Sequence, residues 1–220
     1  LAWRILQQER SDSNGLHSYI GIPQSYFIGT EVIYEFRLMN GLDHFMNQKY
    51  RSLAEIREEY PRIVEAHLAG DFPPAIINQL RAVMADIGDS PLIVRSSSLL
   101  EDNFGYAFAG KYNSYFCPNQ GTNEENLEAL LNAVRRVFAS TLNPDAILYR
   151  QKHGLLDYDE RMAILIQKVV GKPHGRYYFP VLAGVAFSQN PFRWNQKIRR
   201  EDGFLRLVWG FGTRAVDRVS

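Results

Sequence analysis

The chain has 220 residues, of which 45% are hydrophobic and 22% charged, a composition typical of a globular rather than a disordered protein. Its 25 Lys and Arg residues against 24 Asp and Glu residues give a net charge of +1. This balance argues against nucleic acid or an acidic membrane as the partner. No apolar run approaches the roughly 20 residues that span a bilayer. We therefore expect a cytoplasmic protein in which the one cysteine, Cys117, is a reduced thiol.

Both ends of the chain are expected to be cut through larger elements. Residues 1–8 have the apolar pattern of a helix already under way, without a capping residue ahead of it. The strand-like run 204–209 and Gly210-Phe211-Gly212 lie close to the other end. We therefore expect a fragment of a longer protein.

The first part of the chain, residues 1–88, is predicted to be mainly helical. The predicted helix starts are Thr30, the capping box Ser52–Glu55 and Pro74, and two predicted helix ends are Asn40-Gly41 and Gly88. Residues 19–28 contain β-forming residues and predict a strand interrupted by Pro23. Pro61 is expected to kink or split the helix that begins after Ser52.

The second part, residues 89–220, is predicted to be rich in strands. The predicted strands are Pro91–Val94, 111–117, 161–170, 177–188 and 204–209. A capping box at Thr122 predicts a long amphipathic helix, and Pro144 predicts a shorter one that ends near Gly154. Residues 162–170 are apolar on both faces, so this strand should be central in its sheet, and Lys172–Gly175 should form a hairpin turn. The predicted fold class is α+β, with a mixed or antiparallel sheet and flanking helices.

The stretch around Arg95 carries the strongest chemical pattern. Arg95 is expected at the carboxyl end of the strand Pro91–Val94, where a rigid element would hold its guanidinium for bidentate phosphate binding. Ser96–Ser98 offer further hydrogen-bond donors, and Ala109-Gly110 would let the backbone approach an anion closely. The alternative is a solvated serine-rich loop in which Arg95 forms a structural salt bridge.

A second candidate lies at the end of the predicted central strand. Gln167 and Lys168 precede Gly171 and could present an amide and backbone groups to a flat heterocycle. Alternatively, Lys168 simply extends into solvent and Gln167 forms a hydrogen bond within the protein. Other chemistries lack their motifs, because the sequence contains no GxxxxGK[ST], HExxH or GxSxG pattern.

Several blocks together resemble one family. Val94-Arg95-Ser96-Ser97, Glu101-Asp102 and Phe108-Ala109-Gly110 resemble the VRSSA…ED…FAGQ signature of the nucleotide-binding domain of phosphoenolpyruvate synthase and pyruvate phosphate dikinase. Further blocks in the family's order are Ile166–Val170, Ala183–Pro191, Trp209–Gly212 and the segment from Ile22 to Leu42.

The resemblance implies an ATP-grasp-like domain in which two α+β lobes clamp ATP and Mg²⁺. It implies that Arg95 is the catalytic residue that holds the phosphates, with Gly110, Lys111 and Ser114 close to the nucleotide. Gln167 and the backbone at Lys168 and Val169 would border the adenine. In this family the phosphoryl group passes to a catalytic histidine on another domain of the same chain and then to pyruvate. The family's phosphate-binding lysine and its metal ligands would lie outside these 220 residues, so no metal ligand is expected here.

Two departures from the family pattern affect the expected function. Lys111 replaces the family's usual glutamine, and Thr213-Arg214 stands where a nucleotide-contacting glutamate is common. Two alternatives to the dikinase stay open, the first because the acceptor is chosen by other parts of the parent protein and the second because of the departure at Thr213-Arg214. One is a related phosphotransferase that acts on an antibiotic or a glucan, and the other is a nucleotide-sensing module without catalysis.

Overall fold

The contacts within the chain divide it into two compact units. The computed structural model describes residues 20–101, 111–190, 195 and 197–210. Unit 1 comprises Leu1–Val169 and unit 2 comprises Val170–Ser220. The proposed division into lobes at residues 88 and 89 stays a prediction. The predicted helix at residues 1–8 lies outside the described residues.

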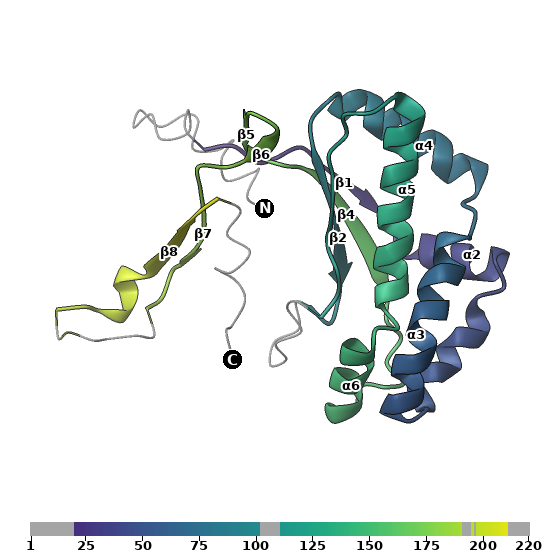
Figure 1. The fold of residues 1–220 in the computed structure, drawn as a ribbon. Helices are drawn as coiled ribbons and strands as arrows, with labels where there is room; N and C mark the ends of the chain where they lie inside the picture. Colours follow the sequence, from purple (N-terminus) through teal and green to yellow (C-terminus); the bar gives the residue numbers. More distant parts are fainter. Residues whose placement is uncertain (1–19, 102–110, 191–194, 196, 211–220) are drawn as a thin grey trace. The chain divides into compact units, whose positions relative to one another are not determined.

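Unit 1 is built on a four-stranded antiparallel sheet (Figure 1). In spatial order its strands are β1 (Ser25–Ile28), β4 (Met162–Lys168), β2 (Leu92–Ser98) and β3 (Tyr115–Cys117). β4 pairs with β1 on one side and with β2 on the other, so the prediction of a central strand is confirmed. The predicted strand 111–117 is shorter than expected, since only its last three residues pair with β2.

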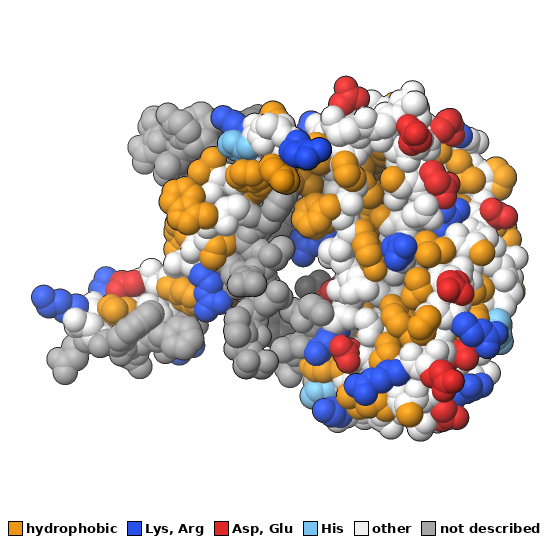
Figure 2. All heavy atoms as spheres, in the orientation of Figure 1, with side chains coloured by type: hydrophobic (Ala, Val, Ile, Leu, Met, Phe, Trp, Pro, Cys, Tyr) orange, Lys and Arg blue, Asp and Glu red, His pale blue; other side chains and the backbone are white. Residues whose placement is uncertain are grey.

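Helices cover one face of this sheet, and α5 runs across that face in Figure 1. The described helices of unit 1 are α2 (Glu31–Met39), η2 (Asp43–Tyr50), α3 (Leu53–Leu68), α4 (Pro74–Ile87), α5 (Asn123–Ser140) and α6 (Pro144–Lys152). The core between the helices contains Phe36, whose ring centroid lies 4.7 Å from that of Phe72 and 5.7 Å from that of Phe138. On the face seen in Figure 2, positive and negative side chains are scattered over the helices rather than gathered by sign.

Local sequence signals fixed most of the helix starts. The Glu55 N–H donates to the Ser52 hydroxyl and the Ser52 N–H donates to the Glu55 carboxylate, and Thr122 and Glu125 repeat this arrangement, so both predicted capping boxes are confirmed. The prediction that Thr30 caps α2 is wrong for its side chain. The Thr30 hydroxyl donates to the Glu31 carboxylate instead of accepting a helix N–H.

The predicted split of the helix at Pro61 is wrong, because α3 runs unbroken from Leu53 to Leu68, and the alternative of a kink stays a prediction. Proline at this position removes the hydrogen bond to the carbonyl of Arg57, four residues earlier. Pro61 and Arg57 are both exposed, so water can reach that carbonyl. Burial of Ile56 and Ile63 against the core keeps the helix continuous despite this loss.

The described residues of unit 2 form two antiparallel strand pairs, β5 (Lys172–His174) with β6 (Tyr177–Phe179) and β7 (Leu182–Phe187) with β8 (Phe204–Trp209). The short helix η3 (Arg200–Asp202) precedes β8. The predicted single strand 177–188 is therefore wrong: its two halves pair with different partners, and Pro180, which has no N–H, lies between them. The predicted turn Lys172–Gly175 is displaced, since its first three residues form β5 and the positive φ of 63° falls at Gly175.

The described residues thus combine helices with antiparallel sheets, and the predicted α+β class is confirmed at that level. Cys117 is buried, and burial raises the pKa of its thiol to about 11. None of the described helices has both the length and the hydropathy needed to cross a bilayer.

Candidate functional site

Successive side chains of β2, which contains Arg95, point to opposite faces of the sheet. The strand continues through Arg95 to Ser98, because Arg95 pairs with Leu165 and Ser98 pairs with Met162 of the central strand. The expectation that the strand ends at Val94 is therefore wrong. Leu92 and Val94 are buried on the helix-covered face, so Arg95 and Ser97 belong to the opposite face.

We call this opposite side the open face of the sheet. The side chains that alternation assigns to it are Ser25, Phe27, Ile93, Arg95, Ser97, Phe116, Ala163, Leu165 and Gln167. Within residues 20–101 and 111–169 it carries no covering helix, and Phe27 is 72% exposed and Phe116 49% exposed. Among the described residues, the open face therefore mixes apolar side chains on all four strands with the polar side chains of Ser25, Arg95, Ser97 and Gln167.

Among the described side chains assigned to the open face, Arg95 carries the positive charge. Its side chain is exposed, and it makes no ion pair or hydrogen bond with any residue that the structure describes. The alternative in which Arg95 forms a structural salt bridge thus finds no partner in the described part of the chain. A guanidinium on a paired strand without an acidic partner can bind an oxyanion through two parallel N–H donors.

Gln167 shares the open face with Arg95. In the sheet register Gln167 faces Ile93, two positions along β2 from Arg95, and diagonal neighbours of this kind lie about 7–8 Å apart. The Gln167 amide nitrogen donates to the Ser25 hydroxyl at 2.9 Å, which leaves the Oε1 oxygen as an acceptor. The structure therefore brings Arg95 and Gln167 into one patch, although 71 intervening residues separate them in the sequence.

The other residues predicted at this strand end are placed differently. Lys168 pairs with Leu92, and alternation puts its side chain on the helix-covered side. Its N–H donates to the Gln24 carbonyl at 2.9 Å, and the N–H of the buried Val169 donates to the Pro91 carbonyl at 2.9 Å. Since both N–H groups are engaged, a ligand here would meet carbonyl oxygens or side chains.

Of the residues expected near the phosphates, the structure describes Lys111 and Ser114, which lie just before β3. Gly110 lies outside the described residues. Lys111 is half-buried, and its ammonium nitrogen lies 5.7 Å from the ring centroid of Tyr149 on α6, a cation–π contact. Ser114 is exposed and precedes Tyr115, which pairs with Val94. Because β2 and β3 are antiparallel and Arg95 follows Val94, Ser114 and Arg95 lie at the same end of the paired region.

The serine run has a second role that the sequence pattern did not suggest. The Ser96 hydroxyl donates to the Glu101 carboxylate at 3.0 Å, and the Ser98 hydroxyl donates to the Glu160 carboxylate. Only Ser97 therefore shares the open face with Arg95. The hydrogen bond from Ser98 to Glu160 was not predicted. The one sequence feature that pointed to Glu160 was an acidic residue two positions before the apolar run that begins at Met162.

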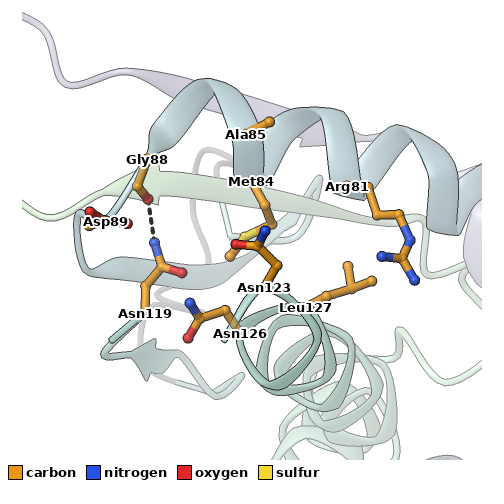
Figure 3. A pocket seen from close by; sticks show the side chains of 9 residues that line it. All are labelled: Arg81, Met84, Ala85, Gly88, Asp89, Asn119, Asn123, Asn126 and Leu127. Carbon is orange, nitrogen blue, oxygen red and sulfur yellow. Dashed lines mark hydrogen bonds between the residues drawn. The ribbon is translucent and has the colours of Figure 1, made fainter. Parts of the chain in front are cut away.

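A cavity of about 340 Å³ lies elsewhere in unit 1, between α4 and the start of α5 (Figure 3). Arg81, Asn119 and Asn126 line it, but Arg81 pairs with Glu124, and the amide nitrogen of Asn119 donates to the Gly88 carbonyl at 2.6 Å. Asn126 exchanges two hydrogen bonds with the backbone of Gly121. None of the predicted site residues lines this cavity.

The exposed guanidinium of Arg95 can bind an oxyanion, whereas no metal site is found among the described residues. Within residues 20–101, 111–190, 195 and 197–210, no three His, Cys, Asp or Glu side chains lie close enough together to hold an ion.

Residues 10–220 match the family described as "Pyruvate phosphate dikinase, AMP/ATP-binding domain". The chain therefore belongs to the pyruvate phosphate dikinase AMP/ATP-binding domain family, and the predicted resemblance is confirmed. The description of this family names AMP and ATP as what its domain binds.

Curated relatives include enzymes of two kinds. The chain is 31% identical over 157 residues to the phosphoenolpyruvate synthase of Escherichia coli (strain K12), which covers 66% of this chain and 17% of the relative. It is 32% identical over 145 residues to the phosphoenolpyruvate synthase of Deinococcus radiodurans, covering 66% of this chain and 16% of the relative. It is 26% identical over 195 residues to a rifampicin phosphotransferase of Bacillus cereus, covering 86% of this chain and 21% of the relative. The chain thus spans about a fifth or less of these relatives' length.

Proposed function

We propose that this chain is the ATP-binding portion of a phosphoenolpyruvate synthase-like dikinase. In this proposal the parent enzyme transfers a phosphoryl group from ATP to a catalytic histidine on another domain and then to pyruvate. The observation that carries the proposal is Arg95, an exposed guanidinium without a described partner, held on a paired strand beside Gln167. The matched family and the phosphoenolpyruvate synthase relatives support the choice of ATP and of this reaction.

The proposed roles follow from the chemistry of phosphoryl transfer, which depends mainly on positioning and on neutralising charge. Arg95 binds two phosphate oxygens through its fork of donors. We assign Lys111, Ser114 and Gly110 to contacts with the phosphates. We assign the Oε1 oxygen of Gln167 to a hydrogen bond from the adenine, with the carbonyls of Lys168 and Val169 beside it. A bound Mg²⁺ would supply further positive charge to the phosphates, and we place its ligands outside the described residues, because no acidic cluster is found among them.

The fold of the parent domain is proposed to be ATP-grasp-like, with residues 1–88 and 89–220 contributing to its two lobes. The mixture of helices and antiparallel strands agrees with this proposal at the level of fold class. A second function is favoured by the rifampicin phosphotransferase relatives, namely transfer of the phosphoryl group to an antibiotic. The open face binds ATP in both proposals, so the choice between them depends on the acceptor.

The test uses the full-length protein that carries this chain. The protein is incubated with Mg-ATP alone and then with pyruvate, rifampicin or a glucan, and phosphohistidine and product are measured by mass spectrometry at neutral pH. We expect an acid-labile phosphohistidine and conversion of pyruvate. Conversion of rifampicin instead would select the second function, and ATP binding without any phosphorylated histidine would contradict both and favour a nucleotide sensor.

A further inference from the structure

A chain of two hydrogen bonds, which we call the Ser25 relay, starts at the side chain of Gln167. The amide nitrogen Nε2 of Gln167 donates to the Ser25 hydroxyl oxygen at 2.9 Å, and the Ser25 hydroxyl donates to the Pro23 carbonyl at 2.9 Å. Ser25 is the direct partner of Gln167 in the register of β1 with β4, so the two side chains lie on the same face. Both are half-buried, which limits the competition of water for these bonds.

The direction of the Ser25 relay follows from the group at its end. A backbone carbonyl can only accept a hydrogen bond, so the single hydroxyl proton of Ser25 is committed to Pro23. The Ser25 oxygen can then only accept from Gln167, and the donors of an amide are on Nε2 and not on Oε1. If the Gln167 amide turned over, Oε1 would face the Ser25 oxygen and one of the two bonds would be lost. The relay therefore fixes which end of the amide faces Ser25.

The other end of the amide is consequently held as an acceptor. The two branches of a planar amide point apart, so Oε1 is turned away from Ser25 when Nε2 is turned toward it. An acceptor in this position pairs with a donor on a ligand and disfavours an acceptor there, because two facing acceptors leave both without a bond. The 6-amino group of adenine is a donor, whereas the 6-oxo group of guanine or hypoxanthine is an acceptor. The orientation of one amide can therefore distinguish these bases.

We propose that Ser25 is a positioning residue that makes this site selective for a 6-amino purine over a 6-oxo purine. Ser25 acts through Gln167, whose amide it holds with the acceptor turned toward the base, and it makes no contact with the nucleotide itself. The inference rests on the proposed binding of ATP with its adenine at Gln167. Ser25 and Gln167 are 142 positions apart in the sequence, so no pattern around Gln167 points to Ser25.

The test compares Mg-ATP with Mg-ITP by calorimetry on the full-length protein. ITP has the same ribose and triphosphate as ATP and carries a 6-oxo group in place of the 6-amino group. The ratio of the two dissociation constants therefore reports on the base, because changes in phosphate contacts affect both nucleotides alike.

Four variants separate the relay from other effects. Ser25→Ala removes the relay, Ser25→Thr keeps a hydroxyl on the same β-carbon, and Gln167→Leu removes the amide. Ser97→Ala is the matched control, since it deletes another hydroxyl of the open face, on a residue that pairs with Ala163 rather than with Gln167.

We expect wild type to bind Mg-ATP more tightly than Mg-ITP by about 2- to 12-fold, the size of one net hydrogen bond, because ITP binds only after the amide turns over and the relay breaks. In Ser25→Ala the amide turns over freely, so the two affinities should come within about twofold of each other. Most of this change should be tighter binding of Mg-ITP, a gain that a general loss of stability would not produce.

The remaining variants test whether Ser25 acts through the amide. Ser25→Thr and Ser97→Ala should keep the wild-type ratio. Gln167→Leu should bring the ratio close to one, and Ser25→Ala added to Gln167→Leu should change the ratio no further, since the amide that the relay holds is already absent.

The inference would be overturned if Ser25→Ala kept the wild-type ratio, or if Ser97→Ala changed the ratio as much as Ser25→Ala does. Wild type that binds Mg-ITP at least as tightly as Mg-ATP would also overturn it, because Oε1 would then not face the base. A further change of the ratio by Ser25→Ala in the Gln167→Leu background would show that Ser25 acts by another route, against the proposal. All of these results leave nucleotide binding in place. Wild type that binds neither nucleotide would instead refute the proposed function, and selection of the base with it.

Discussion

Replacement of Arg95 by alanine should lower the affinity for Mg-ATP with little effect on stability. Arg95 is exposed and bonds to no described residue, so Arg95→Ala should change the free energy of unfolding by no more than about 0.5 kcal/mol. The same change removes a charge-assisted contact to phosphate worth roughly 1.5–3 kcal/mol, which weakens the dissociation constant for Mg-ATP by about 10- to 150-fold. If the contact tightens in the transition state, the rate of histidine phosphorylation should fall by about 100- to 1,000-fold.

The assay is calorimetry with Mg-ATP on the full-length protein, combined with thermal unfolding of the same samples. Arg95→Lys keeps the charge but loses the planar fork, so it should recover only part of the affinity. Arg57→Ala, on the exposed side of α3, serves as the control for the loss of a surface arginine. Wild-type affinity and wild-type phosphorylation in Arg95→Ala would refute the role of Arg95 and of the open face. A large drop in the melting temperature would show that Arg95 instead has a structural partner.

Three further changes test other parts of the molecule. Lys111→Gln should weaken Mg-ATP binding at low salt, and the difference in affinity from wild type should shrink as salt screens the charge. Equal affinities of variant and wild type at low salt would show that Lys111 contacts Tyr149 but does not contribute to Mg-ATP binding. Burial lowers the pKa of His67 to about 4, below the unfolded value of roughly 6.5. The folded state then binds fewer protons than the unfolded state. The free energy of unfolding should therefore fall by up to about 1.4 kcal/mol per pH unit as the pH drops from 6.5 to 4. In urea unfolding, the free energy of unfolding of His67→Asn should depend less steeply on pH. Pro61→Ala restores an N–H inside α3 and should raise the free energy of unfolding by about 1–2 kcal/mol, whereas a decrease would show that Pro61 favours the helix.

Features that depend on nearby residues could be predicted from the sequence. The capping boxes at Ser52 and Thr122 involve residues three positions apart, and both form as expected. The central position of β4 followed from its apolar residues on both faces. Arg95 and Gln167 were each singled out, but only the register of β2 with β4 shows that they share a face.

The errors arose where distant contacts override local preference. β2 runs on through three serines because β4 pairs with it over its whole length, and serine by itself favours a turn. α3 passes through Pro61 because burial of its neighbours outweighs a single lost hydrogen bond. The contact of Ser98 with Glu160 joins residues 62 positions apart, and no spacing rule reaches that far.

The alternation along β2 also limits how this strand can change. Every second residue belongs to the core or to the Glu101 and Glu160 cluster, and the residues between them face outward with Arg95. A substitution at one outward position leaves the inward set intact. Insertion or deletion of a single residue would turn each later side chain to the opposite face, since side chains alternate with a period of two. A library that varies residue identity at Ile93, Arg95 and Ser97 should therefore yield many folded variants, and one that varies strand length should yield few.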